Sequence, residues 1–334
     1  MTPRESGDLA RPAAVPFASP AWLPGGHAQT IYPFFLPHPA IAYRRERVAT
    51  PDGDFWDFDW HDVPGAAPEA PLVVVFHGLE GGAQSQYAVQ LMALLAAHGW
   101  RGVVPHFRGC GGAPNMRPRA YHSGDHEEIG QMLAAVRARV APGTPLYAVG
   151  VSLGGSALLN WIGRAGREGA RTLVAAATVS VPLDLMAAGV AIGQGLNRIY
   201  TWHFLATLKP KALAMARRFP GALDAARIAR VRTMWDFDDV VTAPLHGFAG
   251  ADDYWTRASS KPWLPAVEVP TLVLNARNDP FVPASSLPGP HEVAAVVRLE
   301  YPATGGHVGF MTGPGVGRLD WLPRRIFAWF TRGA

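Results

Sequence analysis

The sequence GVSLG at residues 150–154 places Ser152 in the pattern G-x-S-x-G. A β-branched and aromatic run, LYAVGV, precedes the serine and a helix-forming run follows it, which is the context that the pattern requires of a catalytic nucleophile. The flanking glycines remove side chains that would collide with neighbouring backbone on so sharp a turn. The motif alone is permissive, and an ordinary glycine-rich turn would have the same sequence. The serine therefore needs partners before it predicts chemistry.

A serine hydroxyl is a poor nucleophile unless a base takes its proton, and histidine is suited to that role near neutral pH. The chain contains 12 histidines, so the candidate base must be identified from its position in the sequence. His307 lies in the glycine-rich sequence ATGGHVGF, directly after the last predicted strand, so we expect it at the same edge of the sheet as Ser152. We predict that His307 is the base; the alternative is a histidine of a surface loop.

The base in turn needs an acid that fixes its tautomer and stabilises its charged form. Asp279, in the sequence TLVLNARNDPFVP, also follows a buried strand at this edge. The chain order Ser152, Asp279, His307 is the order expected of a site built on a strand–serine–helix turn. Asn278 has a similar geometry but cannot bear the charge. The other candidates lie in a region without a recognisable buried strand, where solvated or packing roles fit better: Asp236, Asp238, Asp239, Asp252 and Asp253.

An oxyanion that forms next to Ser152 needs two N–H donors, each worth on the order of 3 kcal/mol of transition-state stabilisation. The backbone N–H of Leu153 is one. The second should come from the loop HGLEGG after the strand LVVVF, and we assign it to the backbone N–H of Leu79, with Glu80 as the alternative donor. His77 opens this loop and is predicted to shape it rather than to act as a base.

Histidines also bind metals, and His122 and His126 have i, i+4 spacing with acidic neighbours in YHSGDHEE. Gly124 and Asp125 have the character of a helix start, so the two rings should not share a helix face. The chain has no HExxH pattern and no cysteine cluster, and no G-x-G-x-x-G opens a helix after the first buried strand. We therefore predict neither a metal nor a cofactor. The single cysteine, Cys110, either fills a tight turn near the site entrance or is a reactive thiol.

These residues must be positioned by a sheet, and eight runs predict its strands. The sequences YRRERVAT and DFWDFDWHD alternate polar with apolar residues around the turn PDG, which predicts a half-exposed antiparallel pair. The continuous apolar runs predict strands buried on both faces: LVVVFH, GVVPHF, LYAVGV, TLVAAATVSV, TLVLNA and VVRLEY. Helices are predicted over 85–98, 125–140 and 153–164, and around 319–330. We expect an α/β fold with a mostly parallel sheet and helices on both faces.

The chain divides into three predicted parts. Residues 1–40 are rich in proline and predict an arm packed on the core. The α/β core comprises residues 41–182 and 268–334. Residues 183–267 contain helical segments and no clear buried strand, which predicts a helical cap insertion over the carboxyl edge of the sheet.

Composition excludes several classes of protein. With 49% hydrophobic and 17% charged residues in a chain of 334, a packed core is expected rather than disorder. The net charge of +4 comes from scattered arginines without a dense basic tract, so nucleic acid is not an expected partner. The most apolar stretch, 172–190, is interrupted by Pro182 and Asp184, so no stable membrane anchor is expected. One cysteine fits a reducing compartment, and we predict a cytoplasmic protein.

These motifs together resemble the α/β-hydrolase superfamily and, more narrowly, its YheT-like branch of esterases. The resemblance covers nearly the whole chain. It is carried by WLPGGHAQTIYP, HGLEGGAQSQY, HFRGCGGAPN, YHSGDHEE, GVSLGGSALLNW, GFAGADDYWTRASS and VPTLVLNARNDPFVP. Ser156 departs from the family pattern, which has asparagine there; this concerns helix packing and not the site.

The resemblance implies a charge-relay site of Ser152, Asp279 and His307 that acts as a serine hydrolase, on carboxylic esters and without a cofactor. The expected partner is a small-molecule ester. A thioesterase, amidase or phospholipase on the same fold is the alternative enzyme. A binding protein that retains the cleft without catalysis is the alternative from another class.

Aromatic residues of the insertion, among them Trp202, Phe204 and Trp255, predict an apolar acyl pocket and hence short- to medium-chain esters. The same residues would serve equally well to attach the insertion to the core.

Overall fold

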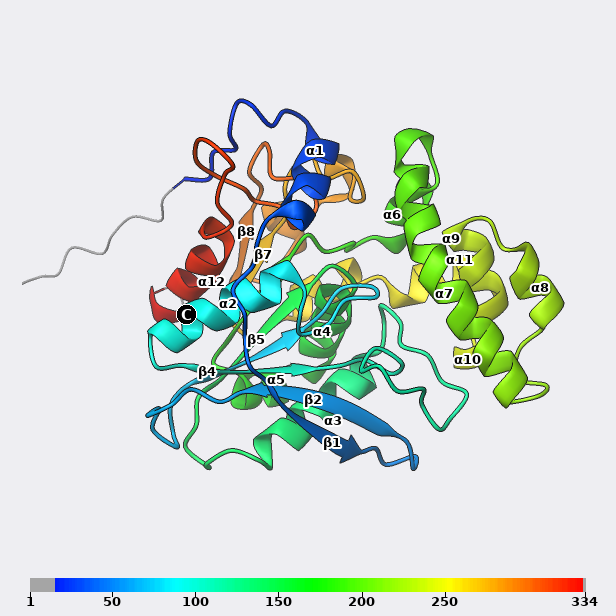
Figure 1. Ribbon diagram of the computed structural model, residues 1–334, viewed down its shortest axis with the longest axis horizontal. Coiled ribbons are helices and arrows are strands. Elements are labelled where there is room, and N and C mark those ends of the chain that lie inside the picture. The colour runs from blue at the N-terminus through cyan, green and yellow to red at the C-terminus, as the bar shows by residue number, and fades with distance from the viewer. Residues whose placement is uncertain (1–15, 333–334) are drawn as a thin grey trace, which may run out of the picture.

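A single sheet of eight strands forms the centre of the molecule (Figure 1). The structure is a computed structural model, and it describes residues 16–332. The first residues of the predicted arm, 1–15, lie outside the described part. The strands are β1 (Arg44–Ala49), β2 (Phe55–His61), β3 (Leu72–Phe76), β4 (Arg101–Pro105), β5 (Leu146–Val151), β6 (Ala175–Val179), β7 (Thr271–Leu274) and β8 (Val297–Glu300). Their order is β1-β2-β4-β3-β5-β6-β7-β8. β2 pairs antiparallel with β1 and β4, and all other pairs are parallel, so the predicted fold class is confirmed.

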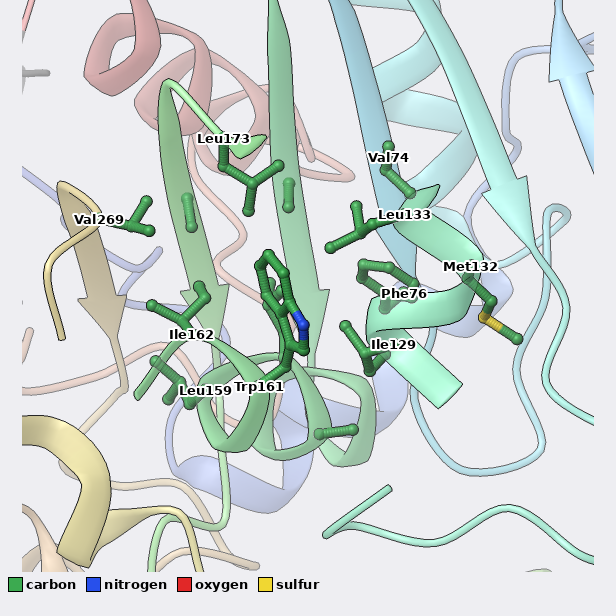
Figure 2. Packing of buried hydrophobic residues seen from close by; sticks show 14 of the residues in the cluster. Val74, Phe76, Ile129, Met132, Leu133, Leu159, Trp161, Ile162, Leu173 and Val269 are labelled. Atoms are coloured by element: carbon green, nitrogen blue, oxygen red, sulfur yellow. The ribbon is translucent and has the colours of Figure 1, made fainter. Parts of the chain in front are cut away.

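Helices cover both faces of this sheet. α3 (His126–Arg137) and α4 (Leu153–Ala165) pack on one face, and α2 (Gln86–Ala97) and α12 (Trp321–Arg332) pack on the other. The alternation of side chains along β3 explains the two layers, since Val74 and Phe76 face the first pair of helices and Val73 and Val75 the second. Figure 2 shows the first layer, in which the side chain of Trp161 points from α4 toward the strands.

Two strand predictions need correction. The segment TLVAAATVSV was predicted as one strand, but α5 (Arg167–Thr172) ends at its first residue and β6 contains only its middle. The pair β1 and β2 is antiparallel as predicted. However, β2 is buried on both faces, and the solvent-exposed residues of the pair lie on β1. Burial of the aspartates of β2 is possible because arginines of β1 pair with them across the register: Arg45 with Asp59 at 2.7 Å and Arg47 with Asp57 at 2.8 Å.

Between β6 and β7 the chain forms helices and no strand. These are α6 (Leu185–Ile192), α7 (Arg198–Arg218), α8 (Ala225–Arg230), α9 (Met234–Phe237), α10 (Ala243–His246) and α11 (Ala251–Ala258). In Figure 1 they lie together to one side of the sheet. Among residues 16–332, none of the helices combines the length and the apolar character needed to cross a bilayer.

The described part of the arm contains α1 (Gly26–Ile31) and a 3₁₀ turn, η1 (Tyr32–Phe35). α1 packs against the loops that follow β7 and β8, because Gly26 meets the carbonyl of Asn278 and Gly309 meets the carbonyl of Gln29. A Cβ atom at either glycine would lie 1.9 Å from that carbonyl oxygen. The glycines of GGHAQT and GGHVGF therefore allow two distant backbone segments to touch.

Candidate active site

Ser152 lies on a strained turn between β5 and α4. Its backbone has φ 52° and ψ −120°, a conformation that L-residues rarely adopt. Three glycines permit the turn: a Cβ at Gly150 would lie 2.6 Å from the Cα of Gly155, one at Gly154 would lie 2.4 Å from the carbonyl oxygen of Phe76, and one at Gly155 would lie 2.9 Å from that of Gly150. The crowding of glycines in VGVSLGG thus follows from backbone packed against backbone.

The three side chains predicted to act together lie together in the structure. The Nε2 atom of His307 is 3.0 Å from the Oγ atom of Ser152, and its Nδ1 atom is 2.8 Å from the Oδ2 atom of Asp279. The second carboxylate oxygen of Asp279 accepts from the backbone N–H groups of Phe281 at 2.8 Å and Val282 at 3.3 Å. The Asp279 side chain is fully buried and that of His307 is 10% exposed. This is the geometry of a nucleophile, a base and an orienting acid.

The loop that carries His307 is held by the N-terminal arm, a role that the sequence analysis missed. The backbone N–H of His307 donates to the Thr30 hydroxyl at 2.8 Å, and the N–H of Gly305 donates to the Gln29 side chain at 2.8 Å. Both arm side chains are buried. The pattern GGHAQT was a signal for this contact, because two glycines beside polar residues in a mostly apolar stretch of the arm, residues 12–40, indicate close approach of another backbone.

Two further side chains fix the same loop. Asn278 accepts from the N–H of Gly306 at 3.0 Å and donates to Gln29 at 2.9 Å, so it links the acid loop, the histidine loop and the arm. Ser180 accepts from the N–H of Val308 at 3.0 Å. Val308 has φ 64°, which is strained for a β-branched residue, and this bond helps to hold it there. Asn278 therefore positions its neighbours and does not stand in for Asp279.

The loop after β3 lies beside the serine, since a Cβ at Gly78 would lie 3.3 Å from the Cβ of Ser152. Within residues 16–332, the backbone N–H of Leu79 has no hydrogen-bond acceptor, whereas that of Glu80 donates to the Tyr121 hydroxyl at 2.8 Å. The alternative donor is thus engaged elsewhere. Leu153 is the first residue of α4, where backbone N–H groups lack intrahelical partners.

His77 is buried and shapes the loop, as expected. Its Nδ1 atom lies 2.8 Å from the carbonyl oxygen of Gly78, and its Nε2 atom accepts from the N–H of Phe107 at 3.2 Å. Burial lowers the pKa of His77 to about 3, which keeps the ring neutral. Both nitrogens are engaged by backbone, so the ring joins the loops after β3 and β4.

Two cavities meet at the serine and the histidine. One has a volume of about 500 Å³ and is lined by the helices of the insertion; the other has about 920 Å³ and extends along the arm. Ser152, His307, Leu79, Phe204 and Phe281 line both. These volumes lie in the range of small-molecule sites.

The three aromatic residues expected in an acyl pocket differ in their positions relative to the two cavities. Phe204 lines both cavities and Trp255 lines the smaller one. Trp255 also attaches α11 to its neighbours, because its indole N–H donates to the buried carboxylate of Asp238 at 2.8 Å. Trp202 lines neither cavity and is 68% exposed, so its assignment to the pocket was wrong.

The histidines of YHSGDHEE do not share a helix, because α3 begins at His126 and His122 precedes it. Burial lowers the pKa of His122 to about 3, and its ring packs against that of His246. Among residues 16–332, no three His, Cys, Asp or Glu side chains are grouped so that they hold a metal ion. Cys110 packs on the core, and burial raises the pKa of its thiol to about 12, which makes it a poor nucleophile.

Comparison with known proteins decides the family. The family model described as the alpha/beta hydrolase fold matches residues 71–314. The chain belongs to this hydrolase family. The Escherichia coli (strain K12) protein named "Putative esterase YheT" is 38% identical over 308 residues, which cover 91% of this chain and 90% of that protein. The resemblance to the YheT-like branch is thereby confirmed.

Two other comparisons extend this result. The hydrolase is 32% identical over 302 residues to phospholipase ABHD3 of Mus musculus, with 87% of this chain and 72% of that protein covered. Among solved structures, the esterase Pf2001 of Pyrococcus furiosus superposes with a TM-score of 0.53 at 14% identity, covering 88% of this chain and 90% of that one. At this identity the superposition supports the fold alone.

Proposed function

We propose that the protein is a serine hydrolase that cleaves carboxylic esters of short to medium acyl chain length through an acyl-enzyme. The observation that carries the proposal is the chain of contacts from Ser152 through His307 to Asp279, with 3.0 Å and 2.8 Å between the interacting atoms, at the meeting point of two cavities. The relative named as an esterase supports the same reaction class.

The proposed reaction has two halves. The Nε2 atom of His307 takes the proton of the Ser152 hydroxyl while Oγ bonds to the ester carbonyl carbon, and the charged His307 is stabilised by Asp279. The backbone N–H groups of Leu79 and Leu153 bind the resulting oxyanion. The bond to the alcohol oxygen then breaks, and the alcohol leaves with the proton from His307. Water, deprotonated by the same nitrogen, attacks the acyl-enzyme and releases the acid and the free serine.

The two cavities fit the two sides of an ester. We assign the acyl chain to the smaller cavity, because apolar side chains of the insertion line it, among them Leu208, Met215 and Phe237. The alcohol side then lies in the larger cavity along the arm. Polar and charged groups occur in both cavities, such as Arg108 and Lys211 in the smaller one and His106 and Gln86 in the larger one. A phospholipase is the second candidate, favoured by the ABHD3 relative and by the size of the second cavity.

The proposal is tested with a series of p-nitrophenyl esters from acetate to decanoate. We expect release of p-nitrophenol with a rapid first turnover, and loss of release in Ser152→Ala. Cys110→Ala is the matched control, because this thiol also lies on the wall of the larger cavity. The variant should keep the activity, since burial raises the pKa of the thiol to about 12 and makes it a poor nucleophile. Activity that survives Ser152→Ala would refute the proposed nucleophile, and a wild type that cleaves none of the esters would favour a binding protein.

A further inference from the structure

Large apolar side chains are exposed on two segments that are far apart in the sequence. One segment is the arm around η1, and the other is the start of α7 with the turn before it. The exposed fractions are unusually high for such residues: Ile31 38%, Phe34 69%, Phe35 78%, Leu196 77%, Ile199 56% and Trp202 68%. We refer to these six residues as the rim.

The two halves of the rim face each other across the larger cavity. Ile31, Phe34 and Phe35 line it from the arm, and Ile199 lines it from α7. The segments also touch, because the His27 ring stacks on the Tyr200 ring, with 3.1 Å between Nδ1 and the hydroxyl oxygen. Figure 1 shows α1 and the α6–α7 corner at the same end of the molecule. The rim therefore borders the mouth of the cavity that leads to Ser152.

Charge is distributed unevenly around the rim. No aspartate or glutamate occurs at residues 16–45 or at residues 185–223, the two stretches that carry the rim. The second stretch contains five cationic residues. Arg198 is exposed between Leu196 and Ile199, whereas the other four lie farther along α7, where Lys211 pairs with Glu80 at 2.8 Å. An exposed apolar patch that contains a cation and lies on segments without carboxylates is complementary to an anionic lipid surface, which offers apolar depth and negative head groups together.

We propose that the rim docks the protein reversibly on an anionic membrane surface, from which the site takes a lipid ester. The link to catalysis rests on the proposed function, whereas docking itself does not. A second copy of the chain is a poorer occupant, because an interface there would close the mouth of the cavity. Contiguous exposed apolar patches mark interaction surfaces or ligand-binding grooves, and Leu196 and Trp202 of the rim line neither cavity.

The test is sedimentation with vesicles of ether-linked phosphatidylcholine, with and without phosphatidylglycerol; ether lipids prevent turnover. Wild type should bind the vesicles that contain phosphatidylglycerol, and less so as salt is raised. The double variant Leu196→Ser/Trp202→Ser should lower the partition constant about tenfold. These two residues line neither cavity.

The matched control is Val174→Ser/Val296→Ser, which removes two exposed apolar residues next to the amino ends of β6 and β8, at the opposite edge of the sheet. The control should bind like wild type, and both double variants should melt at the wild-type temperature. The proposal is overturned if wild type does not sediment, if both double variants bind equally, or if wild type is a dimer that the rim variant dissociates. Failure of p-nitrophenyl ester cleavage would instead remove the proposed function and leave the docking result standing.

Discussion

The site is bounded by two regions that contact it by different means. The arm reaches it through hydrogen bonds, since Thr30 and Gln29 accept from the backbone of the His307 loop. The helical insertion reaches it through apolar walls, and within the described residues no side chain of α6–α11 hydrogen-bonds to Ser152, His307 or Asp279. Directional bonds fix the position of a loop, whereas apolar walls select the shape of what enters.

This difference divides the expected effects of mutation. Changes of the arm residues Gln29 and Thr30 should lower the rate for all substrates alike, because they displace the base. Changes in the insertion should alter the ratio between substrates, because they reshape the smaller cavity. Polar groups inside the insertion should act on its stability. The predictions below separate these three effects.

Asp238 should produce the largest effect, on stability. Burial raises its pKa to about 6, although Thr242 and the Trp255 indole N–H donate to it at 2.6 Å and 2.8 Å. The folded state therefore holds a proton that the unfolded state has lost, and the free energy of unfolding should fall as pH rises from about 4 to about 6. The loss is about 3 kcal/mol, at about 1.4 kcal/mol per pKa unit.

Asp238→Asn removes this titration and keeps a side chain that both partners can bond. Denaturant unfolding of both proteins from pH 4 to pH 8 measures the difference. The variant should be the more stable one at pH 7, with a gap that vanishes toward pH 4. A variant that is less stable at pH 7 would mean that the ionised carboxylate contributes net stability.

Thr30→Val should lower kcat about 10- to 100-fold. The valine has the same shape but leaves the N–H of His307 without its acceptor, and small displacements of a reacting group have effects of this size. KM should change little, and acetate and octanoate esters should be affected equally. Thr30→Ser keeps the hydroxyl and should retain most of the rate. A loss that differs between the two esters would assign the arm to substrate selection.

Met215→Trp should produce the smallest effect, about a tenfold fall in the ratio of octanoate to acetate hydrolysis. The larger side chain shortens the smaller cavity, which Met215 lines from α7. Ala206→Trp places the same group on an exposed position of this helix that lines neither cavity. A control with the same change in ratio would show that the acyl chain does not lie in the smaller cavity.

The sheet was predictable from the sequence because its central strands are continuous apolar runs between helices, as in LVVVF and LYAVGV. The chain order of Ser152, Asp279 and His307 was enough to place them at one edge, since the carboxyl ends of parallel strands share an edge. The same rule does not locate the arm. Its contacts depend on glycines that permit two distant backbone segments to approach closely, and the bonded residues Thr30 and His307 are 277 residues apart in the sequence. The sequence also did not show which side chains of the insertion helices are exposed to solvent. Trp202 was assigned to the pocket on composition alone, and it is exposed.

The central claim is that the hydroxyl of Ser152 is activated by His307 and attacks a carbonyl. Labelling with a fluorophosphonate tests this most directly, because the reagent bonds only to an activated serine and needs no knowledge of the substrate. We expect one label per chain, on the peptide that contains Ser152, absent in Ser152→Ala and strongly reduced in His307→Ala. Labelling elsewhere in the chain, or an unlabelled wild type that is fully folded, would contradict the account.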